Sequence, residues 1–238
     1  MVENRYGFNR STARTFWSDQ ALGLALAVGL GGPLLVTVIA LFDRVGPSAW
    51  WACWLFVTTW VVALQYVAPT WIMPLFNRFT SLDAGELRES LLALAARVGF
   101  PLAGVWVIDG SRRSSKANAF FTGFGSRKRI ALFDTLLATL TSDEIQAVVA
   151  HELGHYRRHH VQSGLAVSVA HLGVLLYLLS HVLQTPALFS AFFINVPSVH
   201  AGLVVFGILM TPIDLPLALA MNAWSRRHEF EADRFAVE

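Results

Sequence analysis

The sequence predicts a mainly α protein: a polytopic helical membrane protein with a small α+β lobe on the cytoplasmic side. Hydrophobic residues make up 55% of the 238 residues and charged residues only 14%, whereas about a quarter of a typical soluble domain is charged. Long uncharged runs flank one stretch in which charges are frequent. The net charge of +2, with scattered basic residues, excludes nucleic acid as a partner and leaves membrane lipid as the expected surroundings.

The segment 1–77 is predicted to form an N-terminal domain with two transmembrane helices. Residues 20–42 carry no charge, and about 20 apolar residues suffice to cross a bilayer. This helix is expected to kink near Gly32 and Pro33. A second uncharged run covers residues 46–77, and its helix is expected to end before Pro69.

Residues 78–160 are predicted to form the catalytic lobe. Apolar residues at helical spacing predict a helix over 83–98, ended by Gly99. Short β-branched or aromatic runs, which predict a small sheet, lie at 105–108, 119–124 and 130–133. Thr141 and Glu144 form a capping-box pattern that opens a helix running to about residue 160.

Residues 161–222 are expected to supply two further membrane-spanning segments, followed by a helix over 223–238. Eleven Lys or Arg lie between Arg78 and Arg158, and only Arg44 lies between the first two spans. The positive-inside rule therefore predicts that the N-terminus, the lobe and residues 223–238 face the cytoplasm, in a bacterial inner membrane or an endoplasmic reticulum.

The sequence H-E-x-x-H at residues 151–155 lies on the helix opened by the capping box. On a helix, His151 and His155 project from one face, so this zincin-type helix predicts half of a zinc site. The single cysteine, Cys53, excludes a cysteine-based site. The alternative interpretation of the pair is two hydrogen-bonded polar residues.

A catalytic zinc site normally takes a third protein ligand. Candidates are His159, His160, His171, His181, His200, His228 and the acids of residues 226–233. We favour Glu229, because Asp233 follows four residues later on the same helix face and can hold a ligand imidazole by a hydrogen bond. Glu231 is expected to face elsewhere. Alternatively, Glu229 pairs with Arg226 or Arg227 on a solvated helix.

These motifs and three others resemble one family, the type I CAAX prenyl endopeptidases, which are integral-membrane zinc metalloproteases. The resemblance rests on YGFNRST at 6–12, APTWIMPLFN at 68–77, NAFFTGFG at 118–125, HELGH at 151–155 and EFEAD at 229–233. It covers nearly the whole chain. Family members continue beyond both ends of these motifs, so the chain resembles a fragment or an abbreviated relative.

The resemblance implies a zinc-dependent endopeptidase with one Zn²⁺ per chain that trims prenylated C-terminal motifs near the membrane interface. It implies that His151, His155 and Glu229 are the zinc ligands, that Glu152 is the general base and that Asp233 supports a ligand. It also implies that an edge strand binds the substrate, through Asn118, Ala119, Phe120, Phe121 and Thr122. An ordinary hairpin strand is the alternative there.

Two other functions remain open at this point. The chain could be a membrane-protein quality-control protease that does not require a prenyl group, or a non-catalytic zinc-binding membrane protein. In either enzymatic case the partner is a peptide or protein substrate, with or without a prenyl group. The run of residues 157–160, Arg-Arg-His-His, is expected to face lipid headgroups at a helix end. The intramembrane positions His171, His181 and Asp214 are expected to line a cavity or to hydrogen-bond between helices.

Overall fold

The computed structural model describes residues 5–123 and 128–238, so Phe124 of the predicted strand lies outside the described residues. The chain divides into two compact units. One unit contains the chain up to Leu22, Leu64–Val161 and Arg227–Glu238. The other contains Gly23–Ala63 and Gln162–Arg226. The division into four successive domains stays a prediction.

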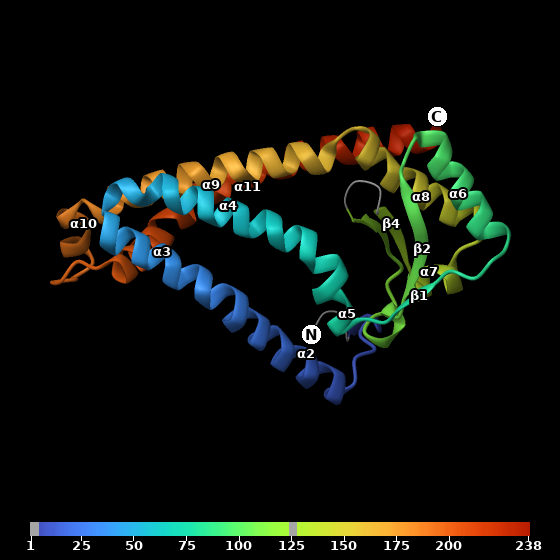
Figure 1. Cartoon of the computed structure of the whole chain (residues 1–238), viewed down its shortest axis with the longest axis horizontal. Coiled ribbons are helices and arrows are strands. Elements are labelled where there is room, and N and C mark those ends of the chain that lie inside the picture. The colour runs from blue at the N-terminus through green and yellow to red at the C-terminus, as the bar shows by residue number, and fades with distance from the viewer. Residues whose placement is uncertain (1–4, 124–127) are drawn as a thin grey trace. The chain divides into compact units, whose positions relative to one another are not determined.

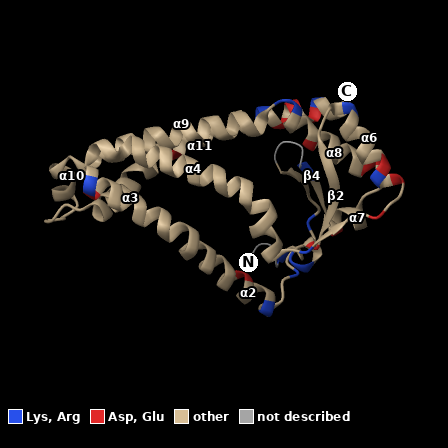
Figure 2. Cartoon of the chain, viewed as in Figure 1, with Lys and Arg blue, Asp and Glu red and all other residues tan. Residues whose placement is uncertain are grey.

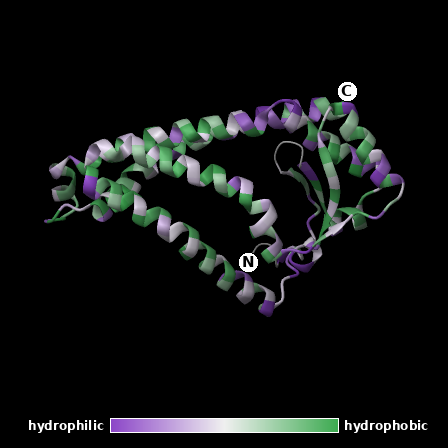
Figure 3. Ribbon diagram, viewed as in Figure 1, coloured by the Kyte–Doolittle hydropathy of each residue, from purple (hydrophilic) through white to green (hydrophobic). Residues whose placement is uncertain are grey.

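Among the described residues, four helical stretches are long and apolar enough to cross a membrane: Ala13–Val45, Pro47–Phe76, His160–Leu183 and Val199–Val237. Most of the length of these helices is free of Lys, Arg, Asp and Glu (Figure 2), and hydrophobic residues dominate it (Figure 3). The protein is therefore an integral, multi-pass membrane protein, as the sequence predicted.

The first stretch consists of α2 (Ala13–Leu26) and α3 (Gly32–Val45), joined by the π-helical turn Ala27–Gly31 (Figure 1). Pro33 lies in the first turn of α3. Because proline has no N–H to donate, the hydrogen-bond ladder of the helix is interrupted there, and a wider turn precedes the proline. The predicted irregularity at Gly32 and Pro33 thus takes the form of a π-helical turn.

The second stretch contains α4 (Trp50–Val67), which ends before Pro69 as predicted. The helical backbone nevertheless continues, through the π-helical turn Ala68–Ile72 and then α5 (Met73–Phe76). Pro69 and Pro74 lie at the start of these two segments, and because proline has no backbone N–H, each leaves one helical hydrogen bond unmade. These prolines therefore interrupt the hydrogen bonding of the helix without ending the helix.

The last two stretches are α9 (His160–Leu183) and α11 (Val199–Val237), with the short α10 (Pro186–Ala191) between them. Pro212 and Pro216 lie inside α11. The boundary predicted between residues 222 and 223 falls within this helix. Glu229 therefore belongs to the same helix as the preceding apolar segment.

The sheet of the lobe has the strand order β1-β2-β4-β3. Its strands are β1 (Phe79–Ser81), β2 (Leu102–Ile108), β3 (Ala119–Thr122) and β4 (Lys128–Phe133). The pairs β1–β2 and β3–β4 are antiparallel, and β2–β4 is parallel. Three strands were predicted; the three-residue β1 was missed, because a run this short shows no alternation.

The helices of the lobe are α6 (Glu86–Val98), α7 (Asp134–Thr139) and α8 (Ser142–Arg157). Gly99 ends α6 with a φ of 70°, a left-handed conformation that glycine adopts without strain. Both hydrogen bonds of the capping box are present, so Thr141 begins α8 as predicted. The six-residue α7 was not predicted.

A hydrophobic core joins the sheet to α6 and α8. Fully buried members are Leu91 of α6, Val105 and Leu132 of the sheet, and Val149 and Leu153 of α8. Burial of each such side chain contributes about 1.5–3 kcal/mol. The core side of α8 is thereby fixed, and the other side of the helix is available for polar residues.

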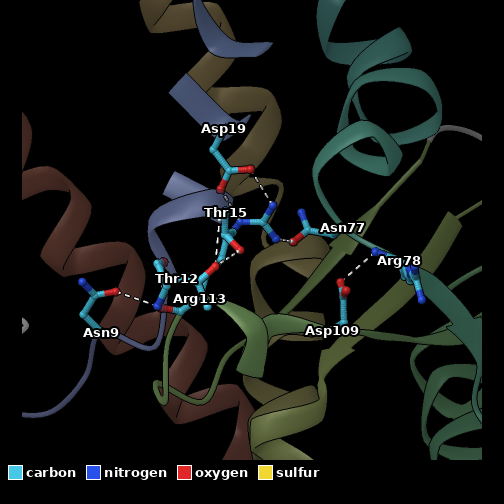
Figure 4. Close-up of polar contacts among 9 residues, drawn as sticks. Asn9, Thr12, Thr15, Asp19, Asn77, Arg78, Asp109 and Arg113 are labelled. Carbon is cyan, nitrogen blue, oxygen red and sulfur yellow. Dashed lines mark hydrogen bonds and ion pairs between the residues drawn. The ribbon is translucent and has the colours of Figure 1, made fainter. Parts of the chain in front are cut away.

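Polar contacts in the same unit tie the N-terminal segment to the loop after β2 (Figure 4). The Arg113 guanidinium donates to both carboxylate oxygens of Asp19, at 2.7 and 2.8 Å, and to Oδ1 of Asn77, at 3.1 Å. Asn9 and Ser114 form an antiparallel backbone bridge. The 6–12 motif therefore serves to anchor this loop.

The second unit has its own core, formed by side chains such as Phe42, Cys53 and Leu179. Cys53 is a free, fully buried thiol. The indole N–H of Trp54 donates to the carbonyl of Val169 at 2.8 Å, which joins α4 to α9. This unit contains the earlier ligand candidates His171, His181 and His200.

Candidate metal centre

Two imidazoles of α8 face each other across one helical turn. The Nε2 atoms of His151 and His155 are 3.1 Å apart, and the ring centroids are 4.9 Å apart. Both side chains are partly buried. Because Leu153 and Val149 fix the other face of α8 in the core, these two nitrogens are presented on a rigid element.

The carboxylate of Glu229 on α11 completes a cluster with the two imidazoles. Its Oε2 lies 3.4 Å from Nε2 of His151 and 3.7 Å from Nε2 of His155. One ligand atom from each of the three side chains lies within 4.8 Å of the others. Two neutral imidazole nitrogens and one carboxylate oxygen suit zinc, which in catalytic sites takes three protein ligands and leaves one position open. The donor set therefore fits the ion that the sequence predicted.

Gly154 explains how α11 comes so close to α8. A Cβ atom at this position would lie 3.1 Å from Cα and O of Ala232 and 3.2 Å from Phe235. Ala232 is itself fully buried. The glycine within the H-E-x-x-H sequence thus permits the helix contact that brings Glu229 to the histidines.

Asp233 lies one turn after Glu229 and contacts the far side of the His151 ring. Its Oδ1 is 2.8 Å from Nδ1 of His151. Because a carboxylate only accepts hydrogen bonds, Nδ1 carries the proton and donates it. The lone pair of His151 is then on Nε2, which faces Glu229. This is the arrangement expected of a carboxylate that orients a metal ligand.

Burial shifts the protonation of two side chains on α8. Burial raises the pKa of Glu152 above its usual value, a protonated His151 would oppose this shift, and the negative charge of Glu229 adds to it. Burial likewise lowers the pKa of His155, although Glu229 opposes the shift. A neutral His155 is the form that binds a metal ion, and a carboxyl with a raised pKa is suited to proton transfer near neutral pH.

The predicted substrate residues lie on and before β3, at the edge of the described sheet, where β4 is the neighbouring strand. Ala119 is buried, and Phe121 makes edge-to-face contacts with Phe100 and Tyr156. Asn118 accepts a hydrogen bond from the N–H of Phe133, through its carbonyl. Phe120 packs edge-to-face on Phe133, and Thr122 pairs with Arg129.

A cavity of about 290 Å³ adjoins the end of β3. Its lining includes Tyr66, Pro69, Trp71, Trp106, Thr122 and Arg129. Arg129 lies over the indole ring of Trp106, 5.0 Å from its centroid. Among the described residues, the cavity lining thus combines aromatic and other apolar side chains with polar ones and with the cationic Arg129.

Sequence reasoning missed a second layer of polar residues behind His155. His160 was expected to face lipid headgroups, but it is 7% exposed and its Nδ1 lies 3.0 Å from Nδ1 of His155. Glu231, which was expected to face elsewhere than Glu229 and Asp233, has its Oε2 3.2 Å from Nε2 of His160. The preceding residue, His159, has a φ of 59°, so a left-handed turn between α8 and α9 places His160 beside His155. The pattern of residues 157–160 contains no signal for this turn.

A helical membrane protein with an H-E-x-x-H helix and a carboxylate from a second helix belongs to the class of membrane metallopeptidases. Residues 81–238 match the model of peptidase family M48, and residues 1–78 match the CAAX prenyl protease N-terminal model, described as five membrane helices. The chain belongs to peptidase family M48. Membership implies a metal cofactor, in agreement with the cluster of donor atoms.

Named relatives agree with this assignment. The chain is 40% identical to the CAAX prenyl protease 1 homolog of Dictyostelium discoideum, over 100% of this chain and 57% of that protein. It is 35% identical to CAAX prenyl protease 1 of Saccharomyces cerevisiae, over 99% of this chain and 56% of that protein. The crystal structure of S. mikatae Ste24p is similar with a TM-score of 0.92 and 35% identity, over 99% of this chain and 58% of that one. The chain therefore spans a little over half the length of these relatives.

Proposed function

We propose that this chain carries the catalytic centre of a zinc-dependent membrane endopeptidase that processes prenylated CAAX-type substrates. The observation that carries the proposal is the convergence of His151, His155 and Glu229 in a chain of family M48. The names of the relatives support the substrate class, since both describe CAAX prenyl proteases. The prediction of a zinc ligand set from the sequence agrees with this convergence.

The proposed reaction is hydrolysis of a peptide bond. Zinc held by these three side chains would polarise the scissile carbonyl and lower the pKa of a bound water towards neutrality. Glu152 acts as the general base: it takes a proton as the water oxygen attacks the carbonyl carbon, and it delivers that proton to the leaving nitrogen as the C–N bond breaks. The products are a carboxylate and a protonated amine, which together account for both protons of the water. Asp233 acts by holding His151 in its ligating orientation.

The substrate would bind as an extra strand on the edge of β3 that no described strand covers, along Asn118–Thr122, because an edge strand offers backbone donors and acceptors to an extended peptide. The cavity at the end of β3, whose lining includes several aromatic side chains, offers space for a hydrophobic substituent of the substrate. The density of basic residues in the lobe supports a cytoplasmic site, as the positive-inside rule predicts.

The test uses the purified, zinc-loaded chain in lipid, a farnesylated CAAX peptide and its unprenylated twin, with cleavage followed by mass spectrometry. We expect cleavage of the farnesylated peptide alone, and a loss of about 10²–10⁴-fold in rate with Glu152→Gln at unchanged zinc content. His151→Ala serves as the second variant and should lose zinc.

Each other outcome is informative. Cleavage of both peptides at equal rates would replace prenyl processing by quality control of membrane proteins. Bound zinc without cleavage of either peptide would contradict an active centre in this chain and favour a zinc-binding role. Parent-like cleavage by Glu152→Gln would remove Glu152 from the mechanism.

A further inference from the structure

Behind the candidate metal ligand His155 lies a chain of hydrogen bonds that leads away from the metal centre. His155 Nδ1 is 3.0 Å from His160 Nδ1, and His160 Nε2 is 3.2 Å from Glu231 Oε2. The other oxygen of Glu231, Oε1, accepts a hydrogen bond from Nε of Arg227 at 3.1 Å. The chain thus links α8, the first residue of α9 and the end of α11.

The chemistry of the last acceptor fixes the direction of these hydrogen bonds. A carboxylate has no proton to donate, so Nε2 of His160 must carry the proton that Glu231 accepts. A neutral His160 then has its lone pair on Nδ1, which can only accept. The proton between the two imidazoles therefore belongs to Nδ1 of His155. That tautomer leaves the lone pair of His155 on Nε2, the atom that faces His151 and Glu229.

We propose that His160 and Glu231 are positioning residues that hold His155 in the tautomer and ring orientation required for zinc binding. The proposal rests on the assignment of His155 as a zinc ligand. It gives His155 the same kind of support that Asp233 gives His151, with an imidazole inserted between the ligand and the carboxylate.

The surroundings of His160 suit a fixed orienting group. Its side chain is 6% exposed, and its ring stacks on that of His228 at 4.0 Å between centroids and 4° between planes. Packing therefore restricts the rotation of the ring, so the direction of its two nitrogens is set before a metal ion arrives. Glu231 is more accessible, at 35% exposed, and its pairing with Arg227 holds it on the helix surface.

The experiment measures the zinc affinity of the full chain by competition with a chelator in detergent, together with the melting temperature of the metal-free protein. His160→Phe keeps a ring to stack on His228 and removes both nitrogens. We expect its zinc affinity to fall about 10- to 100-fold, the usual effect of losing the partner of a ligating histidine. Its metal-free melting temperature should stay near that of the parent, because the ring is retained.

Two further variants separate orientation from packing. His160→Asn places an amide oxygen near the position of Nδ1, so it should recover part of the lost affinity by accepting from His155. Glu231→Gln keeps the shape and removes the charge, and it should weaken zinc binding less than His160→Phe does. His159→Asn is the matched control: His159 is exposed on the same turn, and asparagine tolerates its positive φ, so zinc affinity should be unchanged.

Parent-like zinc affinity in both His160→Phe and Glu231→Gln would overturn the proposal. The proposal would also be overturned, in favour of packing alone, by the following pair of results. His160→Phe would lose zinc affinity and metal-free stability by the same free energy, and Glu231→Gln would change neither. Failure of the parent chain itself to bind zinc would instead contradict the proposed function, so the two failures are distinguishable.

Discussion

At the scale of single residues, the candidate centre combines groups whose protonation is shifted in useful directions. Burial lowers the pKa of His155 and raises the pKa of Glu152. Both effects arise from desolvation of the charged form. The same burial that orients these side chains therefore also makes the stability of the protein depend on pH.

Glu152 should lower the stability of the metal-free protein as the pH rises. Its pKa is above the ordinary value of 4.5 in the folded state, so between pH 4.5 and the raised pKa the folded state holds a proton that the unfolded state has lost. The contribution of protonated Glu152 to folding stability is fully present below pH 4.5. It is lost as the pH rises through the pKa that Glu152 has in the folded state. Glu152→Gln should therefore gain melting temperature relative to the parent between pH 4 and 8.

The control for this pH prediction is Glu144→Gln. A hydrogen bond from the backbone N–H of Thr141 lowers the pKa of Glu144, so the parent gains stability as the pH rises towards 4.5. Above that pH, the variant should have a lower melting temperature than the parent. Melting curves of both variants in chelator-treated detergent solution measure the signs. If the difference in melting temperature between Glu152→Gln and the parent did not change with pH, the raised pKa of Glu152 would not be its cause.

Arg113 should be replaceable by lysine only at a cost in stability. Its guanidinium makes three hydrogen bonds at once, two of them with Asp19. The hydrogen bonds to Asp19 also raise the pKa of Arg113 above its ordinary value. A lysine keeps the charge but lacks this fork of donors. We expect Arg113→Lys to lose about 1–2 kcal/mol in free energy of unfolding, since the pair is only partly exposed.

The measurement is denaturant unfolding in detergent, with Arg112→Lys as the matched control. Arg112 is the exposed neighbour of Arg113, so the same exchange there should change the stability by less than about 0.5 kcal/mol. Equal effects at the two positions would show that the contacts in Figure 4 do not stabilise the protein.

At the scale of elements, the candidate centre depends on the contact between α8 and α11. α8 supplies two histidines from a helix fixed by its capping box and by the core of the lobe. α11 supplies Glu229 and Asp233 from one face, four residues apart. The two helices are adjacent at Gly154 and Ala232, so a change at this contact should affect the metal centre without altering any ligand.

Gly154→Ala should weaken zinc binding. The new methyl group would approach the backbone of Ala232 to 3.1 Å, and overpacking of this kind typically costs about 1–3 kcal/mol. Displacement of α11 would move Glu229 away from the histidines. We expect at least a tenfold loss of zinc affinity, measured by chelator competition.

Gly164→Ala is the matched control for this prediction. Gly164 is also a helical glycine, in α9, and a Cβ there would meet nothing within 4 Å. Alanine has the higher helix propensity, so Gly164→Ala should leave zinc affinity unchanged and stability equal or slightly higher. Unchanged zinc affinity in Gly154→Ala would contradict the role assigned to the helix contact.

At the scale of the whole molecule, the four long apolar helices of the described residues make the chain a multi-pass membrane protein, and the candidate metal centre combines residues of the lobe with a residue of α11. The relatives are considerably longer, since the chain spans a little over half of their length. The activity proposed for the chain is thus a property to be tested on these 238 residues.

Sidedness gives a prediction at this scale. In a background with Cys53→Ala, a cysteine introduced by Ser142→Cys at the start of α8 should react with a membrane-impermeant maleimide only after permeabilisation of the cells. A cysteine introduced by Ser48→Cys, between the first two apolar stretches, should react in intact cells. Both serines are exposed. The reverse labelling pattern would place the lobe outside the cytoplasm, against the positive-inside rule.

The sequence by itself determined the elements with strong local signals. The uncharged runs predicted the long apolar helices, because a bilayer requires about 20 apolar residues in succession. The capping box predicted the start of α8, and the H-E-x-x-H spacing predicted a pair of imidazoles on one face. Glu229 could be favoured from its spacing to Asp233 and from the family resemblance. Apart from the resemblance, each of these signals lies within one continuous stretch of the chain.

Tertiary structure alone decided what depends on contacts between distant segments. It brought Glu229 within reach of the histidines by the close approach of α11 at Gly154, and it buried His160 against His155 by a left-handed turn at His159. It also placed β3 at the edge of the sheet, since strand order is set by pairing between segments. The physical reason is that the partners in such contacts lie far apart in the sequence. His160 and Glu231, for example, are more than 70 residues apart, so their hydrogen bond leaves no local pattern in the chain.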